Sequence, residues 1–86
     1  MSKTQLKKDM GIFDEISRRF YRSFNQQDTV ESAYYYKMLK EIIQHTGNQR
    51  YNNRIGLLNL TINQSGDQNQ IEQLKQVHQI LKAGLV

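Results

Sequence analysis

The feature that most constrains the fold is the spacing of the apolar residues, which recur every three or four positions along most of the chain. Successive residues of an α-helix are about 100° apart, so this spacing gathers the apolar side chains on one face of a helix. The chain contains no proline, and nothing in the sequence therefore interrupts long helices. Gly47, Gly66 and Gly84 stand where the apolar pattern stops, as is common at helix C-termini. The pattern predicts an all-α protein.

Four segments carry the pattern, and the sequence predicts helices over about 4–25, 29–46, 49–64 and 68–83. The links between them are only a few residues long, which favours antiparallel neighbours. We therefore predict a single domain, residues 1–86, folded as an antiparallel up-and-down four-helix bundle. The predicted core stripe of the first helix consists of Leu6, Met10, Phe13, Ile16, Phe20 and Phe24.

The other three stripes follow the same spacing. The second consists of Val30, Ala33, Tyr36 or Tyr35, Leu39, Ile42 and Ile43. The third consists of Tyr51, Ile55, Leu58 and Ile62, widened by Leu57 and Leu60. The fourth consists of Ile71, Leu74, Val77, His78 and Leu81, with Ile80 beside them. Asp28 lies three residues before Glu31, as in a capping box, and we expect Ser65 or Asp67 to cap the last helix.

Three consecutive tyrosines, Tyr34, Tyr35 and Tyr36, fall within the second predicted helix. Side chains that follow each other at about 100° cannot all face one core. Tyr36 and Tyr35 lie on the same side as Leu39, whereas Tyr34 lies nearer the Met38 edge. We expect Tyr36 or Tyr35 to fill the core and the third ring to lie at its rim, where a phenol meets either water or a partner.

Composition excludes several classes of protein. The chain has 86 residues, a net charge of +4 and no cysteine, so a disulfide or a thiolate site is excluded. The N-terminal segment has no apolar run typical of a signal peptide, and no segment is apolar enough to span a membrane. We expect a soluble, cytoplasmic protein.

The sequence also lacks the patterns of a catalytic or metal site. His45 and His78 lie on different predicted helices, and neither has a second ligand four residues away. Asp14 and Glu15 are adjacent and diverge on a helix, so they cannot act as a paired acid and base. Known phosphate-binding and hydrolase motifs are absent. We predict no enzymatic activity, no metal, no cofactor and no small-molecule substrate.

Basic side chains form two sets at helical spacing. Arg18 and Arg22 share one face of the first helix, and Arg50 and Arg54 repeat the spacing on the third. Such groups suit phosphate contacts, which makes a small basic nucleic-acid-binding regulator an alternative function. No short recognition helix after a tight turn is evident, and a solvated polar face is the simpler interpretation.

The order of these segments resembles the immunity proteins of class IIa (pediocin-like) bacteriocins, the enterocin A immunity family. In that family the third helix begins with a basic residue and an apolar pair, here "RIGLLNL" from Arg54. A short turn then leads to an apolar-periodic fourth helix that ends near a glycine, here "IEQLKQVHQILKAG". The resemblance covers residues 10–84 and implies a small, basic, cysteine-poor four-helix bundle.

The resemblance further implies a binding function. Such proteins act at the inner face of the membrane on the bacteriocin bound to its receptor, the membrane components of the mannose phosphotransferase system. A protein-binding adaptor, whose exposed tyrosine face contacts another protein or a second copy, is a further alternative. The candidate partner-binding residues are Tyr34, Tyr35, Tyr51, Arg18, Arg22, Arg50, Arg54, Leu85 and Val86.

Overall fold

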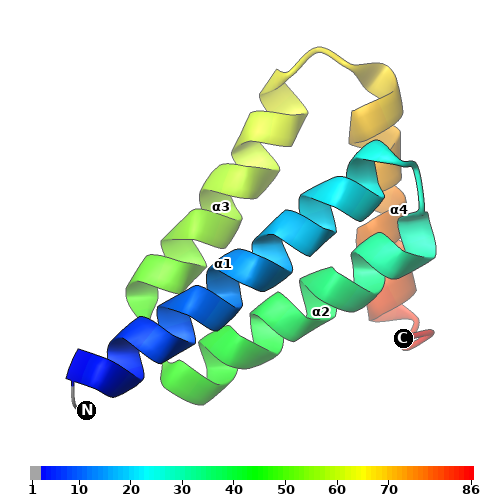
Figure 1. The fold of residues 1–86 in the computed structure, drawn as a ribbon. Coiled ribbons are helices and arrows are strands. Elements are labelled where there is room, and N and C mark those ends of the chain that lie inside the picture. Colours follow the sequence, from blue (N-terminus) through cyan, green and yellow to red (C-terminus); the bar gives the residue numbers. More distant parts are fainter. Residues whose placement is uncertain (1–2) are drawn as a thin grey trace.

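The computed structural model describes the backbone of residues 3–86 and the side chains of residues 11–86. Its helices are α1 (Lys3–Asn25), α2 (Thr29–Thr46), α3 (Gln49–Gln64) and α4 (Gln68–Lys82). Each helix runs roughly opposite to the preceding one (Figure 1). The predicted all-α bundle is confirmed, and every helix bound lies within one residue of its predicted position. The predicted core residues Leu6 and Met10 lie outside the described side chains.

α2 is the helix that approaches each of the other three, and its backbone lies closest to α1 and α4. The backbone of α3 stands farther from α1 and α2, and large side chains bridge that distance. The ring of Tyr51 stacks on that of Phe13, with 4.5 Å between centroids and 11° between planes. Aromatic side chains therefore attach α3 to the first helical hairpin.

The core contains apolar side chains from all four helices. Its buried members are Phe13, Ile16, Phe20, Phe24, Ala33, Tyr36, Leu39, Tyr51, Ile55, Leu58, Ile62, Leu74 and Val77. These positions follow the predicted stripes because a short antiparallel bundle buries one face of each helix. Ile42, Ile43, Ile80 and Leu81 are partly buried against this cluster.

The predicted core positions of Val30, Leu57 and Leu60 are wrong, because all three side chains are exposed. Ser32 takes the inward position in the first turn of α2, and Val30 lies about 200° away from it around the helix. In this part of α3 the inward position belongs to Leu58, and Leu57 and Leu60 are turned from it by about 100° and 200°. Apolar character alone therefore overstated the width of these stripes.

The helix caps follow the sequence in part. The Asp28 carboxylate accepts a hydrogen bond from the Glu31 N–H at 3.1 Å, as a capping residue does. The second half of the capping box is absent, since the Glu31 carboxylate accepts instead from the Tyr35 hydroxyl at 3.2 Å. Of the two candidates for the last helix, Asp67 is the N-cap and accepts from the N–H groups of Asn69 and Gln70.

The end of α1 contains a strained residue that the sequence does not reveal. Gln27 has a φ of 61°, in the left-handed region that is costly for any residue with a Cβ. The Gln27 N–H donates to Phe24 O at 3.1 Å and the Asp28 N–H donates to Ser23 O at 3.0 Å. These two bonds form a Schellman motif, in which glycine usually occupies the position of Gln27.

Gln27→Gly is expected to raise the free energy of unfolding by about 0.5–1 kcal/mol, because glycine adopts positive φ without a steric penalty. Urea denaturation measures the change. Gln26→Gly is the matched control: its φ is negative, so the added chain entropy should lower stability. A loss of stability in both variants would contradict the strain.

The three tyrosines take three different environments. Tyr36 is 2% exposed and belongs to the core, and its hydroxyl accepts a hydrogen bond from Asn59 Nδ2 at 3.0 Å. Tyr35 is half-buried against the edge of the core. Tyr34 is 53% exposed, and its ring lies edge-on to that of Tyr35 with 5.7 Å between centroids. Tyr36 is therefore the core ring, and Tyr34 is the one left in water.

Alanine substitution should rank these rings by burial. Tyr36→Ala is expected to lower the free energy of unfolding by about 3–5 kcal/mol, as truncation of a buried aromatic ring does. Tyr34→Ala should change it by about 0.5 kcal/mol or less, because its ring packs against little. Chemical denaturation of both variants gives the comparison, and similar losses would contradict the placement of α2.

Candidate functional site

The outward face of α1 is flanked by two hollows. The hollow toward α2 has a volume of about 410 Å³ and is lined by Glu15, Arg19, Arg22, Ser23, Gln26, Glu31 and Tyr35. The hollow toward α3 has a volume of about 450 Å³ and is lined by Asp14, Ser17, Arg18, Tyr21 and Arg54. We define the arginine–tyrosine face as the basic and aromatic members of these two sets: Arg18, Arg19, Tyr21, Arg22, Tyr35 and Arg54.

On the α3 side, Arg54 is held by two contacts with α1. Its Nη1 lies 2.6 Å from Asp14 Oδ1, and its guanidinium lies 5.1 Å from the centroid of the Phe13 ring. The same Phe13 ring stacks on Tyr51, so the position of Arg54 depends on the packing of α3 against α1. Partial burial raises the pKa of the neighbouring Tyr21, and the charge of Arg54 opposes part of that shift.

One carboxylate on α1, that of Glu15, lies beside two more arginines. Arg19 Nε donates to Glu15 Oε1 at 3.2 Å, and Arg18 Nη2 lies 3.9 Å from Glu15 Oε2. Hydrogen bonds raise the pKa of Arg19, the one with Glu15 more than the one with Tyr35, so Arg19 is positively charged at neutral pH. Arg22 forms no ion pair with any residue whose side chain is described. Its guanidinium is therefore available to a partner.

The arginine–tyrosine face has the composition of a protein-binding surface. Arginine and tyrosine are enriched at interfaces because each combines a large contact area with polar groups of defined geometry. The four arginines here stand beside three carboxylates, those of Asp14, Glu15 and Glu31, which leaves a small positive excess. Such a surface suits a partner that offers both carboxylates and apolar side chains.

The structure brings together four of the predicted contact residues: Arg18, Arg22, Tyr35 and Arg54. Arg19, which the sequence clusters with Arg18 and Arg22, also belongs to the face. Tyr21 belongs to it as well, although the sequence did not single it out as a contact. The spacing of Tyr21 from Arg18 could have found it, since residues three or four apart on a helix are neighbours.

Other predicted contacts lie elsewhere. The prediction that Tyr51 contacts a partner is wrong, because its side chain is 1% exposed and stacked on Phe13. Arg50 is exposed on α3 but lines neither hollow. Leu85 is exposed, whereas Val86 is half-buried against the core, and its main-chain oxygen accepts from Lys37 Nζ at 2.8 Å.

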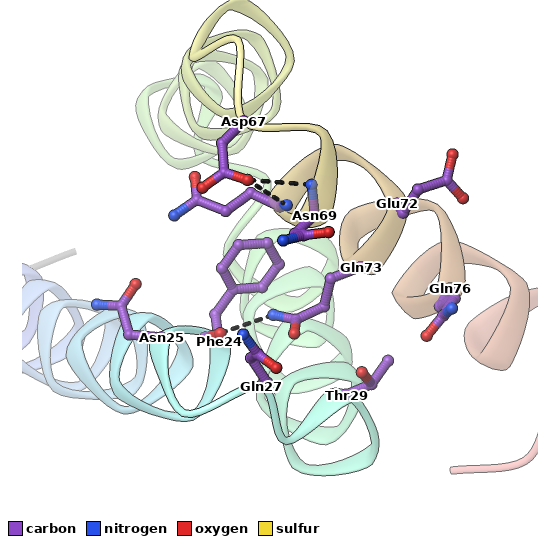
Figure 2. A pocket seen from close by; sticks show the side chains of 10 residues that line it. Phe24, Asn25, Gln27, Thr29, Asp67, Asn69, Glu72, Gln73 and Gln76 are labelled. Carbon is purple, nitrogen blue, oxygen red and sulfur yellow. Dashed lines mark hydrogen bonds between the residues drawn. The ribbon is translucent and has the colours of Figure 1, made fainter.

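A larger hollow, of about 550 Å³, lies where α1 ends and where α2 and α4 begin (Figure 2). Amide side chains dominate its lining, which the sequence suggested only as polar surface. Gln73 is buried there and donates through Nε2 to Phe24 O at 2.7 Å, while Asp67 caps α4. These groups hold the ends of α1 and α4 together, so the polar lining of this hollow serves the packing of the bundle.

A small polar cluster, formed by Tyr36, Asn59 and His78, joins α2, α3 and α4. Asn59 on α3 donates to the hydroxyl of Tyr36 on α2, and its Oδ1 lies 3.1 Å from Nε2 of His78 on α4. The His78 ring lies edge-on to that of Tyr36, with 5.2 Å between centroids. Desolvation, and then the charge of Lys40, lower the pKa of His78.

This shift predicts how stability depends on pH. The unfolded chain binds a proton at His78 more readily than the folded protein does, so the free energy of unfolding should fall as pH drops below about 6.5. Above that pH, His78 is neutral in both the folded and the unfolded chain, so its contribution to stability should be complete. Urea denaturation at several pH values measures the slope, and His78→Gln should flatten it relative to the unsubstituted protein. An unchanged slope in the variant would contradict a lowered pKa.

Comparison with known proteins gives no family for this chain: no family model, curated protein or solved structure matches it. Within the part of the chain that the structure describes, no helix is both long enough and apolar enough to cross a bilayer.

Proposed function

We propose that this protein is a cytoplasmic immunity protein that protects its cell against a pediocin-like bacteriocin. It would bind the bacteriocin–receptor complex at the inner face of the membrane, with the mannose phosphotransferase membrane components as the receptor. The resemblance of the helix order and of the α3 and α4 segments supports this role. The observation that carries it is the arginine–tyrosine face, because an immunity protein of this kind acts by binding.

The internal ion pairs of the face favour tight binding. Free arginine side chains lose considerable rotamer entropy when a partner immobilises them. Here Asp14 holds Arg54, and Glu15 holds Arg19, before any partner arrives. The part of the surface that must become ordered on binding is correspondingly smaller.

The same pairs argue for a protein partner over a nucleic acid. Of the five arginines in the chain, Arg18, Arg19 and Arg54 already face carboxylates of the same chain. Phosphate binding draws on unpaired cations, since affinity rises with the number of phosphates neutralised. Mixed charges with tyrosines instead match the polar and aromatic character of protein interfaces.

The test is a protection assay in a bacteriocin-sensitive Gram-positive indicator. Cells that express the protein are challenged with a panel of pediocin-like peptides, and we expect a large rise in the inhibitory concentration of at least one peptide. Arg22→Glu should reduce that protection about tenfold or more, as loss of one central charged contact does. Its free energy of unfolding should fall by no more than about 1 kcal/mol, because Arg22 is exposed and forms no ion pair with the described residues, and only its interaction with the C-terminal end of α1 is reversed.

Lys40→Glu is the matched control. It makes the same change of charge at an exposed position of α2 that lines neither hollow. Protection should survive this substitution. Equal losses in both variants would show a general effect of charge, and no protection against any peptide by the unsubstituted protein would overturn the proposed role.

A further inference from the structure

The hollow between α1 and α3, of about 450 Å³, is lined by more positive than negative charge. Four of its lining residues are Asp14, Ser17, Arg18 and Tyr21, which recur at i, i+3, i+4 and i+7 and so share one face of α1. Arg54 reaches the same hollow from α3. Two arginines and one aspartate give the lining a net charge of +1, so the hollow favours an anion.

Arg54 is held in position before any ligand binds. Its Nη1 lies 2.6 Å from Asp14 Oδ1, and its guanidinium lies 5.1 Å from the centroid of the Phe13 ring. A guanidinium has five N–H groups in a planar fork, which is more than one carboxylate can occupy. N–H groups of Arg54 therefore remain for a second anion in the hollow.

Arg18 and Tyr21 supply the other donors. Arg18 is only loosely paired, since its Nη2 lies 3.9 Å from Glu15 Oε2. The Tyr21 hydroxyl forms no hydrogen bond with the described residues, and because burial raises its pKa it stays protonated at neutral pH and can donate. Ser17 is not a donor to the hollow, because its hydroxyl already donates to Phe13 O at 2.8 Å.

We propose that this hollow is a carboxylate-binding site, in which Arg18, Tyr21 and Arg54 donate hydrogen bonds to an aspartate or glutamate side chain of the protein partner. A carboxylate has a charge of −1, which balances the +1 of the lining. A phosphate dianion would leave excess negative charge beside Asp14, so a carboxylate is the better match. The identity of the occupant as a partner side chain rests on the proposed function, whereas the affinity of the hollow for a carboxylate does not.

The exposure of the hollow sets the expected strength. Hydrogen bonds between a guanidinium and a carboxylate are strong and directional, but solvent weakens them when both groups are exposed. A single small carboxylate should therefore bind in the millimolar range. Within a larger interface the same contact fixes which acidic side chain of the partner lies against α1.

An NMR titration with a small probe tests the site without the partner. The probe is N-acetylglutamate α-amide, which has one carboxylate, and its neutral control is N-acetylglutamine amide, both at constant pH and ionic strength. The side-chain Nε–H signals of Arg18 and Arg54 should shift and saturate with the carboxylate probe alone.

Arg50 is the internal control, because it is exposed on α3, forms no ion pair with the described residues and lines neither hollow. Shifts at Arg50 as large as those at Arg18 and Arg54, or equal shifts with the neutral probe, would overturn the proposal. Tighter binding of inorganic phosphate than of the carboxylate probe would overturn the choice of ligand.

Tyr21→Phe removes one donor and keeps the ring, which packs edge-on against Phe20 with 5.6 Å between centroids. It should weaken binding of the carboxylate probe about fivefold, as loss of one hydrogen bond to a charged group does. Tyr34→Phe is the matched control, since Tyr34 is exposed on α2 and lines neither hollow, and its affinity should be unchanged. Equal affinities in the two variants would overturn the role of the Tyr21 hydroxyl.

The same two variants separate this inference from the immunity role. If the unsubstituted protein protects cells, Tyr21→Phe should lower protection about fivefold and Tyr34→Phe should not. Equal protection by both variants would overturn a partner carboxylate as the occupant and leave the immunity role intact. If the unsubstituted protein gives no protection, the proposed function fails, and the titration alone decides whether the hollow binds a carboxylate.

Discussion

The stacking of Tyr51 on Phe13 is the interaction on which the other features of this bundle depend. The backbone of α3 lies too far from α1 for small side chains to meet, so two aromatic rings span the distance between them. Because α3 is attached in this way, Arg54 reaches both Asp14 and the outer surface of the Phe13 ring. Loss of the stack would displace a helix and would also remove one side of the arginine–tyrosine face.

The same attachment leaves α3 with an open outer side. α2 approaches each of the other three helices, whereas the backbone of α3 stands farther from α1 and α2 and forms one side of the bundle (Figure 1). Its outer leucines, Leu57 and Leu60, are therefore exposed. The arginine–tyrosine face and the exposed outer side of α3 are thus two consequences of one packing arrangement.

Polar groups between the helices make the packing specific. Gln73 ties α4 to the end of α1, Asn59 links α2, α3 and α4, and the hydroxyls of Ser23 and Ser32 lie 3.1 Å apart between α1 and α2. A buried polar group is costly unless it finds a hydrogen-bond partner. Each of these groups therefore favours one register of the helices over alternatives that would leave it unpaired.

The sequence by itself determined the number of helices, their bounds and most of the core, because helical periodicity, glycine stops and Asp28 act over one or two turns of chain. It also supplied four members of the arginine–tyrosine face. Only the tertiary structure decided that Tyr36 is the core ring, that Tyr51 is buried, and that Leu57 and Leu60 face outward. Those outcomes depend on how far apart the helices stand and how each is rotated about its axis, and both are set by side chains distant in the sequence.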